Sequence, residues 1–272
     1  NSMGTGKTAA TVWAADYLMS RKQIRSAVVV SPLSTLERVW ADTIFEFHHR
    51  KFVVVHGTKA ARLKALNTPA DFYIINHDGI KVMWDELKKR SDLDLYIVDE
   101  GAVFRNQKTD RYKALWDLAG PDTDKWLWWL TGAPMPNSPT DIWAQARMVN
   151  PTLVPRYFGR FRDSVMTRIT QFKWVPTSGW EDKIYAMLRP SIRFTLDDNL
   201  DLPPITYSTR EVAMSKQQEE AYLQMHRECV LNAKEGRVVA LNEGVQIVKL
   251  LQILNGIVYT AEKEEVSLDP KP

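Results

Sequence analysis

The stretch Met3-Gly4-Thr5-Gly6-Lys7-Thr8 opens a segment whose apolar residues follow helical spacing. Glycines in such a turn let backbone N–H groups converge on phosphate oxygens, and the start of the following helix adds its positive dipole end. The amine of Lys7 then reaches the β- and γ-phosphates, and the hydroxyl of Thr8 suits Mg²⁺. The general pattern has a further glycine where this chain has Asn1. Residues 3–8 therefore predict a nucleotide-binding loop, with a glycine-rich helix start as the alternative.

Two adjacent carboxylates follow an apolar run 92 residues after Lys7, in the sequence Val98-Asp99-Glu100. Hydrolysis of a phosphoanhydride needs a metal ion that neutralises charge and a base that orients and deprotonates the attacking water. We expect Asp99 to hold Mg²⁺ together with Thr8, and Glu100 to be the base. A solvated strand end would also carry acidic residues, but the combination with the GKT loop favours an ATPase.

Five short apolar runs alternate with amphipathic helical patterns in the first two thirds of the chain. The runs are residues 27–30, 52–55, 72–75, 95–98 and 126–130. Continuous apolar runs bounded by turn residues are typical of strands buried on both faces. Their alternation with helices predicts an α/β fold with a mostly parallel sheet flanked by helices. Ligands of such sheets bind beyond the carboxyl ends of the strands, so polar residues there are candidates for the site.

The composition is that of an ordinary globular protein: 272 residues, 44% hydrophobic, 25% charged, net charge +3. These values exclude a disordered chain, a collagen and a coiled coil. No apolar run approaches the roughly 18 residues that span a bilayer, and we see no signal peptide. The single cysteine, Cys229, excludes an internal disulfide and a multi-cysteine zinc site and fits a reducing, cytoplasmic location. The mildly basic charge permits a nucleic-acid partner without requiring one.

The pattern changes after Pro151, where Arg, Phe and Trp residues mix without a strong strand. Residues 205–214 alternate like an exposed strand. Residues 215–233 are predicted to form a helix with Ser215 as its N-cap. A strongly apolar helix is predicted over residues 244–254, closed by a glycine-containing turn.

A third motif, Leu130-Thr131-Gly132-Ala133-Pro134-Met135-Pro136-Asn137, follows the last predicted strand and continues to Asp141-Ile142-Trp143. It resembles motif III of superfamily 2 helicases, in the form found in Snf2-like DNA translocases (TGTPLQN…ELW). Residues 1–8 resemble their DEMGLGKT, and residues 99–106, DEGAVFRN, resemble DEAHRLKN. Further matches follow in the family's order at residues 30–32, 75–78, 150–159, 188–193, 202–204, 217–222 and 249–253. The resemblance covers nearly the whole chain.

The resemblance implies that residues 1–200 form a RecA-like, ATP-binding P-loop NTPase lobe with a helical protrusion at about residues 151–190. Residues 201–272 would form a C-terminal helical connection, a strand and helices leading to a second RecA-like lobe that is absent from this chain. In the family that lobe supplies an arginine needed for turnover. The chain alone is therefore expected to be nearly inactive.

The resemblance further implies an ATP hydrolase that couples ATP hydrolysis to movement on DNA or to its remodelling, with ATP and Mg²⁺ as cofactors. Duplex DNA would be bound through its backbone, and no membrane is involved. The residues implied to contact DNA are Ser31, Pro32, Asn76, His77 and Asn106. Thr131 and Gly132 would sense the nucleotide state and pass it to these residues.

Two departures from the family pattern leave other functions open. Asn1-Ser2 replaces an acidic pair, and Ala102 replaces the histidine of DEAH, which in the family helps to link the metal site to motif III. One alternative is therefore a non-hydrolysing DNA-binding scaffold with a helicase-like fold. A P-loop kinase or GTPase is a second alternative, but it gives no reason for the VDE and LTGAP motifs at these spacings.

Overall fold

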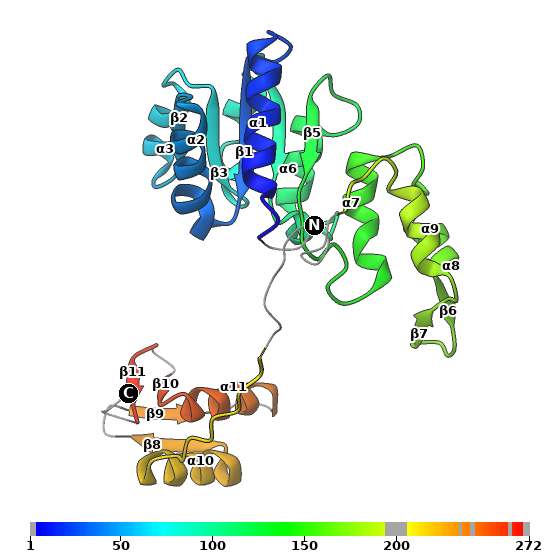
Figure 1. The fold of residues 1–272 in the computed structure, drawn as a ribbon. Helices are drawn as coiled ribbons and strands as arrows, with labels where there is room; N and C mark the ends of the chain where they lie inside the picture. Colours follow the sequence, from blue (N-terminus) through cyan, green and yellow to red (C-terminus); the bar gives the residue numbers. More distant parts are fainter. Residues whose placement is uncertain (1–3, 194–205, 234–235, 240–242, 261–262, 269–272) are drawn as a thin grey trace. The chain divides into compact units, whose positions relative to one another are not determined.

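The computed structural model describes residues 4–193, 206–233, 236–239, 243–260 and 263–268 (Figure 1). The chain divides into two compact units, Asn1–Pro203 and Pro204–Pro272. No helix in these described ranges is long and apolar enough to cross a membrane.

Unit 1 is built on a five-stranded sheet in which every strand pairs in parallel with its neighbours, as predicted. The strands are β1 (Ser26–Ser31), β2 (Phe52–Val55), β3 (Phe72–Asn76), β4 (Leu93–Val98) and β5 (Trp126–Trp129). Their order across the sheet is β2-β3-β1-β4-β5. Val30 of β1 lies in register with Ile75 of β3 and Val98 of β4, so the carboxyl ends of these strands meet at one edge.

Helices and short helical turns connect the strands of unit 1. The helices are α1 (Lys7–Ser20), α2 (Asp42–His48), α3 (Lys59–Leu66), α4 (Gly79–Val82), α5 (Trp84–Lys88), α6 (Asp110–Ala119) and α7 (Ile142–Val149). A π-helical stretch, Leu36–Ala41, leads into α2. Single 3₁₀ turns form at Leu33–Thr35, Gly101–Phe104 and Pro139–Asp141.

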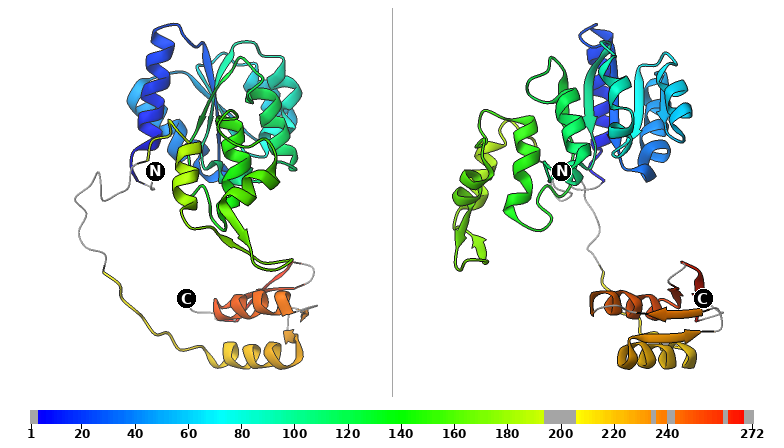
Figure 2. Two further views of the ribbon diagram at one scale, coloured as in Figure 1. Left: turned by 90° about the vertical axis from the view of Figure 1, so that its right-hand side faces the viewer. Right: turned by 180° about the vertical axis from the view of Figure 1, so that it is seen from behind.

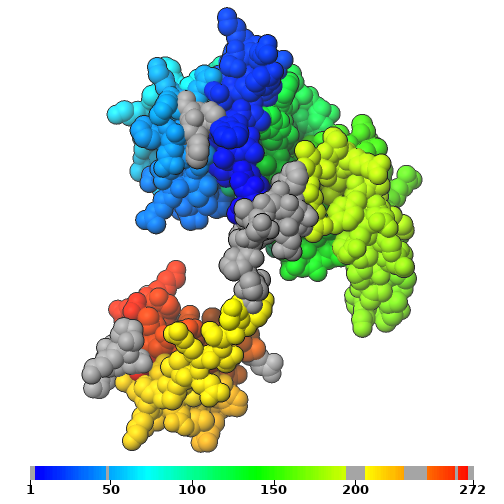
Figure 3. Space-filling view, in the orientation of Figure 1, coloured from blue at the N-terminus to red at the C-terminus, as the bar shows by residue number. Residues whose placement is uncertain are grey.

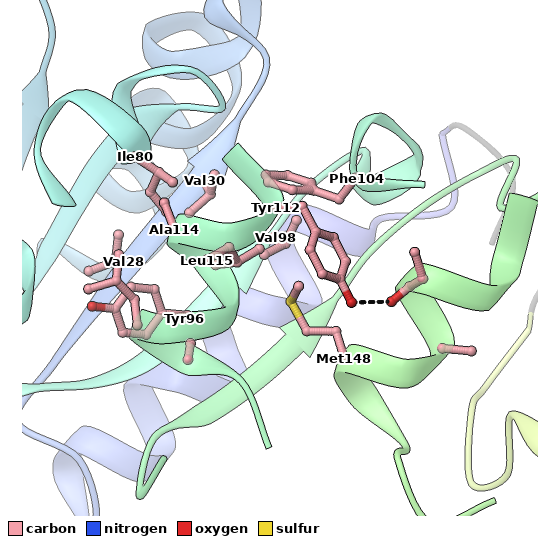
Figure 4. Packing of buried hydrophobic residues seen from close by; sticks show 14 of the residues in the cluster. Val28, Val30, Ile80, Tyr96, Val98, Phe104, Tyr112, Ala114, Leu115 and Met148 are labelled. Atoms are coloured by element: carbon pink, nitrogen blue, oxygen red, sulfur yellow. Dashed lines mark hydrogen bonds between the residues drawn. The ribbon is translucent and has the colours of Figure 1, made fainter. Parts of the chain in front are cut away.

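The two faces of the sheet are covered by different helices because side chains alternate along each strand. Val29 packs in one cluster with Val12 of α1 and Trp40 of the π-helical stretch. Val28 and the other strand residues that point to the same face pack in the other cluster with Leu115 of α6 and residues of α3 to α5 (Figures 2 and 4). Helix α1 lies along the surface of unit 1, shown in blue in Figure 3.

The prediction that residues 126–130 are buried on both faces is wrong. Trp126 is 45% exposed, and the other residues of β5 are half-buried. The reason is the position of β5 at the edge of the sheet, where it pairs with β4 alone.

A small subdomain follows α7. It consists of α8 (Phe158–Val165), β6 (Met166–Arg168), β7 (Trp174–Pro176) and α9 (Trp180–Met187), and the two strands form an antiparallel hairpin that the sequence did not indicate. Phe161 and Ile184 are buried between its helices and the rest of unit 1. The guanidinium of Arg162 stacks on the ring of Trp174 at 3.8 Å, so a basic residue and an aromatic residue hold the hairpin to α8.

Unit 2 contains α10 (Lys216–Glu228), β8 (Val230–Ala233), β9 (Gly236–Val239), α11 (Glu243–Leu254), β10 (Ile257–Tyr259) and β11 (Glu265–Ser267). Ser215 caps α10 through a capping box with Gln218, as its position predicted. Helix α10 ends earlier than predicted because Val230–Ala233 pairs as a strand with β9. The strand predicted at residues 205–214 is wrong over the described residues 206–214, which form no regular element. Residues 202–204 lie outside the described residues.

Candidate functional site

The loop before α1 has the backbone that its glycines predict. Gly4 and Gly6 have φ angles of 78° and 74°, in the left-handed region that side chains with a Cβ rarely adopt. Gly6 is the N-cap of α1, so Lys7 and Thr8 are the first two helical residues. The first backbone N–H groups of a helix lie at its positive dipole end. Met3, the first residue of the predicted loop, lies outside the described residues, as do Asn1 and Ser2.

Lys7 and Glu100 are brought together at the carboxyl edge of the sheet. The Nζ atom of Lys7 lies 3.9 Å from Oε1 of Glu100, and the two side chains are 10% and 33% exposed. The parallel pairing of β1 with β4 places the turn after Val98 beside the start of α1. A cation predicted to bind phosphate and a candidate base therefore lie together at one site.

Asp99 is held by four hydrogen bonds. Its backbone N–H donates to Val30 O at 2.8 Å, and its carboxylate accepts from Trp40 Nε1 at 3.0 Å and from the Glu100 N–H at 3.1 Å. Its carbonyl oxygen accepts from Nε2 of His77 at 2.7 Å. Each carboxylate oxygen can accept more than one bond, so both retain capacity for a further ligand.

The donor set at this edge fits Mg²⁺. The hydroxyl of Thr8 and the carboxylate of Asp99 are oxygen ligands, which Mg²⁺ prefers. Magnesium that binds with a nucleotide usually takes one or two carboxylates together with phosphate oxygens. The described part of the chain holds no group of three or more His, Cys, Asp or Glu side chains placed for a metal. Thr8 and Asp99 suit an ion that also takes oxygen ligands from a phosphate.

Glu100 has an unusual backbone. Its φ and ψ angles are 48° and 51°, in the left-handed region, which costs a residue with a Cβ roughly 1–3 kcal/mol. The next N–H, of Gly101, donates to Leu130 O at 3.0 Å and fixes the turn against the end of β5. Such strain is concentrated at active sites, where the surrounding structure stabilises it.

The loop that carries Thr131 and Gly132 leaves the sheet beside this turn. The N–H of Leu130 donates to Val98 O at 2.8 Å, so the chain is still paired with the end of β4 immediately before Thr131. Thr131 and Gly132 are half-buried. Because Thr131 and Gly132 lie next to the Asp99–Gly101 turn, their positions suit residues that move when a ligand binds at that turn.

The residues expected to contact DNA differ in how far they are exposed. Pro32 and Asn76 are half-buried at the strand ends, and Asn106 is exposed in the turn before α6, where its Oδ1 accepts from the Lys108 N–H. Ser31 is fully buried. Its hydroxyl has no hydrogen-bond partner among the residues that the structure describes.

His77 is also buried, at 7% exposure. Burial lowers its pKa, so its ring is neutral at pH 7, and Nε2 is the protonated nitrogen because a carbonyl oxygen can only accept. Both side chains are thus largely inaccessible in this structure, and contact of Ser31 and His77 with DNA stays a prediction. Ser31 is the last residue of β1 and precedes Pro32, and His77 directly follows Asn76 at the end of β3.

Sequence reasoning missed Arg62, which is 8% exposed on α3. Its guanidinium donates to Val55 O at 2.9 Å, to Gly57 O at 3.0 Å and to Oδ1 of Asn76 at 3.1 Å. Burial lowers its pKa. Since the guanidinium only donates, the Asn76 oxygen must face Arg62, and the Asn76 NH₂ group points the other way. The one signal in the sequence is an arginine inside the apolar stretch Ala60–Leu66.

Comparison with known proteins adds the family. The profile of the SNF2-related domain matches residues 1–262. The putative protein p41 of Acyrthosiphon pisum secondary endosymbiont phage 1 is 29% identical over 95% of this chain and 59% of its own length. The chromatin structure-remodeling complex subunit snf21 of Schizosaccharomyces pombe is 26% identical over 99% of this chain and 24% of its own length. The chain thus spans about three fifths or less of these relatives.

Among solved structures, the Sulfolobus solfataricus SWI2/SNF2 ATPase core in complex with dsDNA matches with a TM-score of 0.60 and 21% identity. The match covers 94% of this chain and 53% of the archaeal chain, and it shows that the two share a fold. The profile match covers residues 1–262, and the sheet within this range brings Lys7 to Glu100. This chain therefore belongs to the SNF2-related domain family, the family of Snf2/SWI2 ATPase cores.

Proposed function

We propose that this chain provides the ATP-binding lobe of an ATP-dependent DNA translocase, which couples ATP hydrolysis to movement on DNA or to its remodelling. The observation that carries the proposal is the 3.9 Å approach of Lys7 Nζ to Glu100 Oε1. These residues come from two motifs that are 93 positions apart. Transfer of a phosphoryl group to water uses both a cation on the phosphates and a group that positions and deprotonates the water.

The chemistry of the site follows from its side chains. Residues 3–8 bind the phosphates of ATP through backbone N–H groups, and Lys7 neutralises charge on the β- and γ-phosphates. Thr8 and Asp99 hold Mg²⁺, which supplies further charge neutralisation when bound. Glu100 orients the attacking water and accepts its proton. The hydrogen bonds from Trp40 and from the Glu100 N–H keep the Asp99 carboxylate in one orientation.

DNA binding is proposed at the carboxyl edge of the sheet. The proposed contacts to the backbone of a duplex come from Ser31, Pro32, Asn76, His77 and Asn106, of which Ser31 and His77 are buried in this structure. The NH₂ group of Asn76 is a suitable donor for a phosphate oxygen, since the carbonyl oxygen of the same amide is engaged by Arg62. The archaeal protein with the same fold was solved with dsDNA, which supports a duplex as the partner.

The complete activity requires more than this chain. The chain covers 59% of the phage relative, and we propose that a second RecA-like lobe in the full-length protein supplies the arginine that stabilises the transferring phosphoryl group. Residues 131–132 pass the nucleotide state from the site to the DNA-binding residues.

The test is steady-state ATP hydrolysis by the full-length protein, with and without duplex DNA. Magnesium-dependent turnover that rises on adding DNA is the expected result. Binding of ATP and DNA without any turnover would instead support a non-hydrolysing scaffold, which the alanine at position 102 makes the main alternative. Transfer of phosphate to a small molecule, unaffected by DNA, would contradict both.

A further inference from the structure

Gln145 of α7 is a buried polar residue that neither the motifs nor the proposed chemistry uses. It is 1% exposed. Its Oε1 accepts from the indole Nε1 of Trp129 at 3.2 Å, and its Nε2 donates to Pro134 O at 2.8 Å and to Asp141 O at 3.0 Å. An indole N–H only donates and a carbonyl only accepts, so the amide can have one orientation. A single side chain thus ties β5 to two points of the 131–141 loop.

Trp129 in turn packs against the turn that follows Asp99 and Glu100. A Cβ placed on Gly101 would lie 2.1 Å from Nε1 and 2.2 Å from Cε2 of Trp129, so this approach of ring to backbone requires glycine. The indole also meets Phe104 edge to face, with ring centroids 5.7 Å apart. The site turn and the indole therefore cannot move independently.

The same cluster reaches the strand end of β3. Phe104 packs edge to face on His77 with centroids 5.5 Å apart, and His77 donates to the Asp99 carbonyl oxygen at 2.7 Å. The contacts form a continuous path from Asp99 through His77, Phe104 and Trp129 to Gln145. A buried polar group whose hydrogen bonds are all made rigidifies its surroundings, and here it does so between the site turn and the loop.

We propose that Gln145 is a positioning residue that, through Trp129, couples the Asp99–Gly101 turn to the 131–141 loop. The inference rests on the proposed ATPase function. It deepens that function because the path uses no side chain at position 102, where this chain has alanine. Gln145 and Trp129 are themselves neither phosphate ligands, metal ligands nor the base, so loss of Gln145 should disturb communication with DNA while nucleotide binding continues.

The experiment uses the full-length protein and three variants: Gln145→Leu, Trp129→Phe and the double variant. Each is measured for ATP affinity, for turnover without DNA and for turnover at saturating duplex DNA. Loss of one buried hydrogen bond corresponds to about a tenfold effect, so DNA-stimulated kcat should fall about tenfold in each single variant. ATP affinity and turnover without DNA should stay within about threefold, because neither Gln145 nor Trp129 takes part in binding or hydrolysis. The double variant should be no worse than the more affected single variant, because both remove the same bond.

Trp84→Phe is the matched control. The indole of Trp84 on α5 donates to Oδ2 of Asp117 on α6 at 2.7 Å. The Trp84→Phe variant therefore loses the same kind of bond, and neither residue belongs to the path. Its DNA-stimulated turnover should equal that of the parent.

The outcomes separate the inference from the proposed function. A parent protein without ATP turnover contradicts the proposed function. In that case hydrogen exchange of residues 131–141 decides the inference: protection on adding Mg²⁺–ATP should appear in the parent and be lost in Gln145→Leu. In an active parent, full DNA stimulation in a folded Gln145→Leu variant overturns the inference, as does an equal loss of ATP affinity and kcat. If Gln145→Leu lowers the melting temperature too far to be studied, Trp129→Phe, which keeps an aromatic ring in place, decides by the same readouts.

Discussion

The indole Nε1 of Trp40 donates a hydrogen bond of 3.0 Å to Oδ2 of Asp99, across 59 residues of sequence. Both residues are buried, Trp40 completely and Asp99 to 8% exposure. Trp40 lies in the π-helical stretch between β1 and α2. π-Helical stretches are rare in proteins overall, and those that occur are frequently found at functional sites. Here the stretch belongs to the segment that orients a proposed metal ligand.

Replacing Trp40 by Phe should therefore change the binding of Mg²⁺ more than it changes the hydrolysis of ATP. The indole donor is lost while most of the packing remains, so we expect a loss of about 1 kcal/mol in the free energy of unfolding. The Mg²⁺ concentration for half-maximal ATP binding should rise several-fold. Nucleotide-binding titrations at graded Mg²⁺ measure this, with Trp84→Phe as the control. An unchanged Mg²⁺ dependence would show that the hydrogen bond does not hold the Asp99 carboxylate for a metal.

Glu100→Gln and Lys7→Ala should separate hydrolysis from binding in the full-length protein. Glutamine keeps the shape of Glu100 but cannot accept the proton, so turnover should fall by about 10²-fold or more while ATP affinity stays within a few-fold. Loss of the Lys7 ammonium removes a charge-assisted phosphate contact and should weaken ATP binding itself. Nucleotide titration and steady-state hydrolysis distinguish the two. Glu181→Gln, at an exposed position on α9, is the control, and parent-rate hydrolysis by Glu100→Gln would refute the assignment of the base.

Gly101→Ala should destabilise unit 1, because the new Cβ would lie within 2.1 Å of the indole of Trp129. Overpacking of this kind costs about 1–3 kcal/mol, measured as the free energy of unfolding in denaturant. Trp129→Leu in the same chain removes the ring and should recover part of the loss. Gly159→Ala is the control, since a Cβ there meets nothing within 4 Å. Equal effects of the two alanine substitutions would mean that the close approach does not constrain position 101.

How much the sequence could predict depended on the length of each pattern. Runs such as residues 72–75 and 95–98 were predictable because a parallel strand covered by helices is apolar without interruption. The β6–β7 hairpin was not, since strands of three residues carry too few side chains to set a period. Residues 205–214 do show the alternation expected of an exposed strand. A strand also needs a neighbouring strand to pair with, and the alternation does not indicate whether there is one.

Within the site, the motif residues were predictable and their supports were not. Lys7 and Glu100 belong to recognisable patterns, and the structure brings them together. Arg62 and Gln145 make most of their hydrogen bonds to backbone carbonyls, whose positions depend on the fold. Their one signal is a polar residue with apolar neighbours on a helix, as in Ala144-Gln145-Ala146. Such a residue is a reason to look for buried acceptors.

DNA binding by the full-length protein should be driven by the phosphate backbone. Each phosphate contact adds about −0.9 to the slope of log affinity against log salt, so affinity should fall steeply between low and physiological salt. Binding of fluorescent duplexes of equal length and random sequence should differ little, because contacts to phosphates carry no base information. Asn76→Ala should weaken binding equally for every sequence, whereas an exposed residue away from the strand ends, such as Gln171, should not matter when replaced. A strong preference for one sequence would contradict backbone recognition.

Residues 1–272 on their own should fold but hydrolyse ATP very slowly. The sheet of unit 1 has helices on both faces and its own buried clusters, so it needs no partner to close its core. The proposed arginine from a second lobe is missing, and such a group accelerates related nucleotide hydrolases by about 10³–10⁵-fold. That factor corresponds to about 4–7 kcal/mol of activation free energy. The measurement is steady-state hydrolysis by residues 1–272 and by the full-length protein, each with and without duplex DNA, after circular dichroism has established that both are folded. We expect DNA-dependent turnover only from the full-length protein and not from residues 1–272. Rapid turnover by residues 1–272 without DNA would mean that Lys7, Asp99 and Glu100 suffice, and the two-lobe mechanism would have to be abandoned.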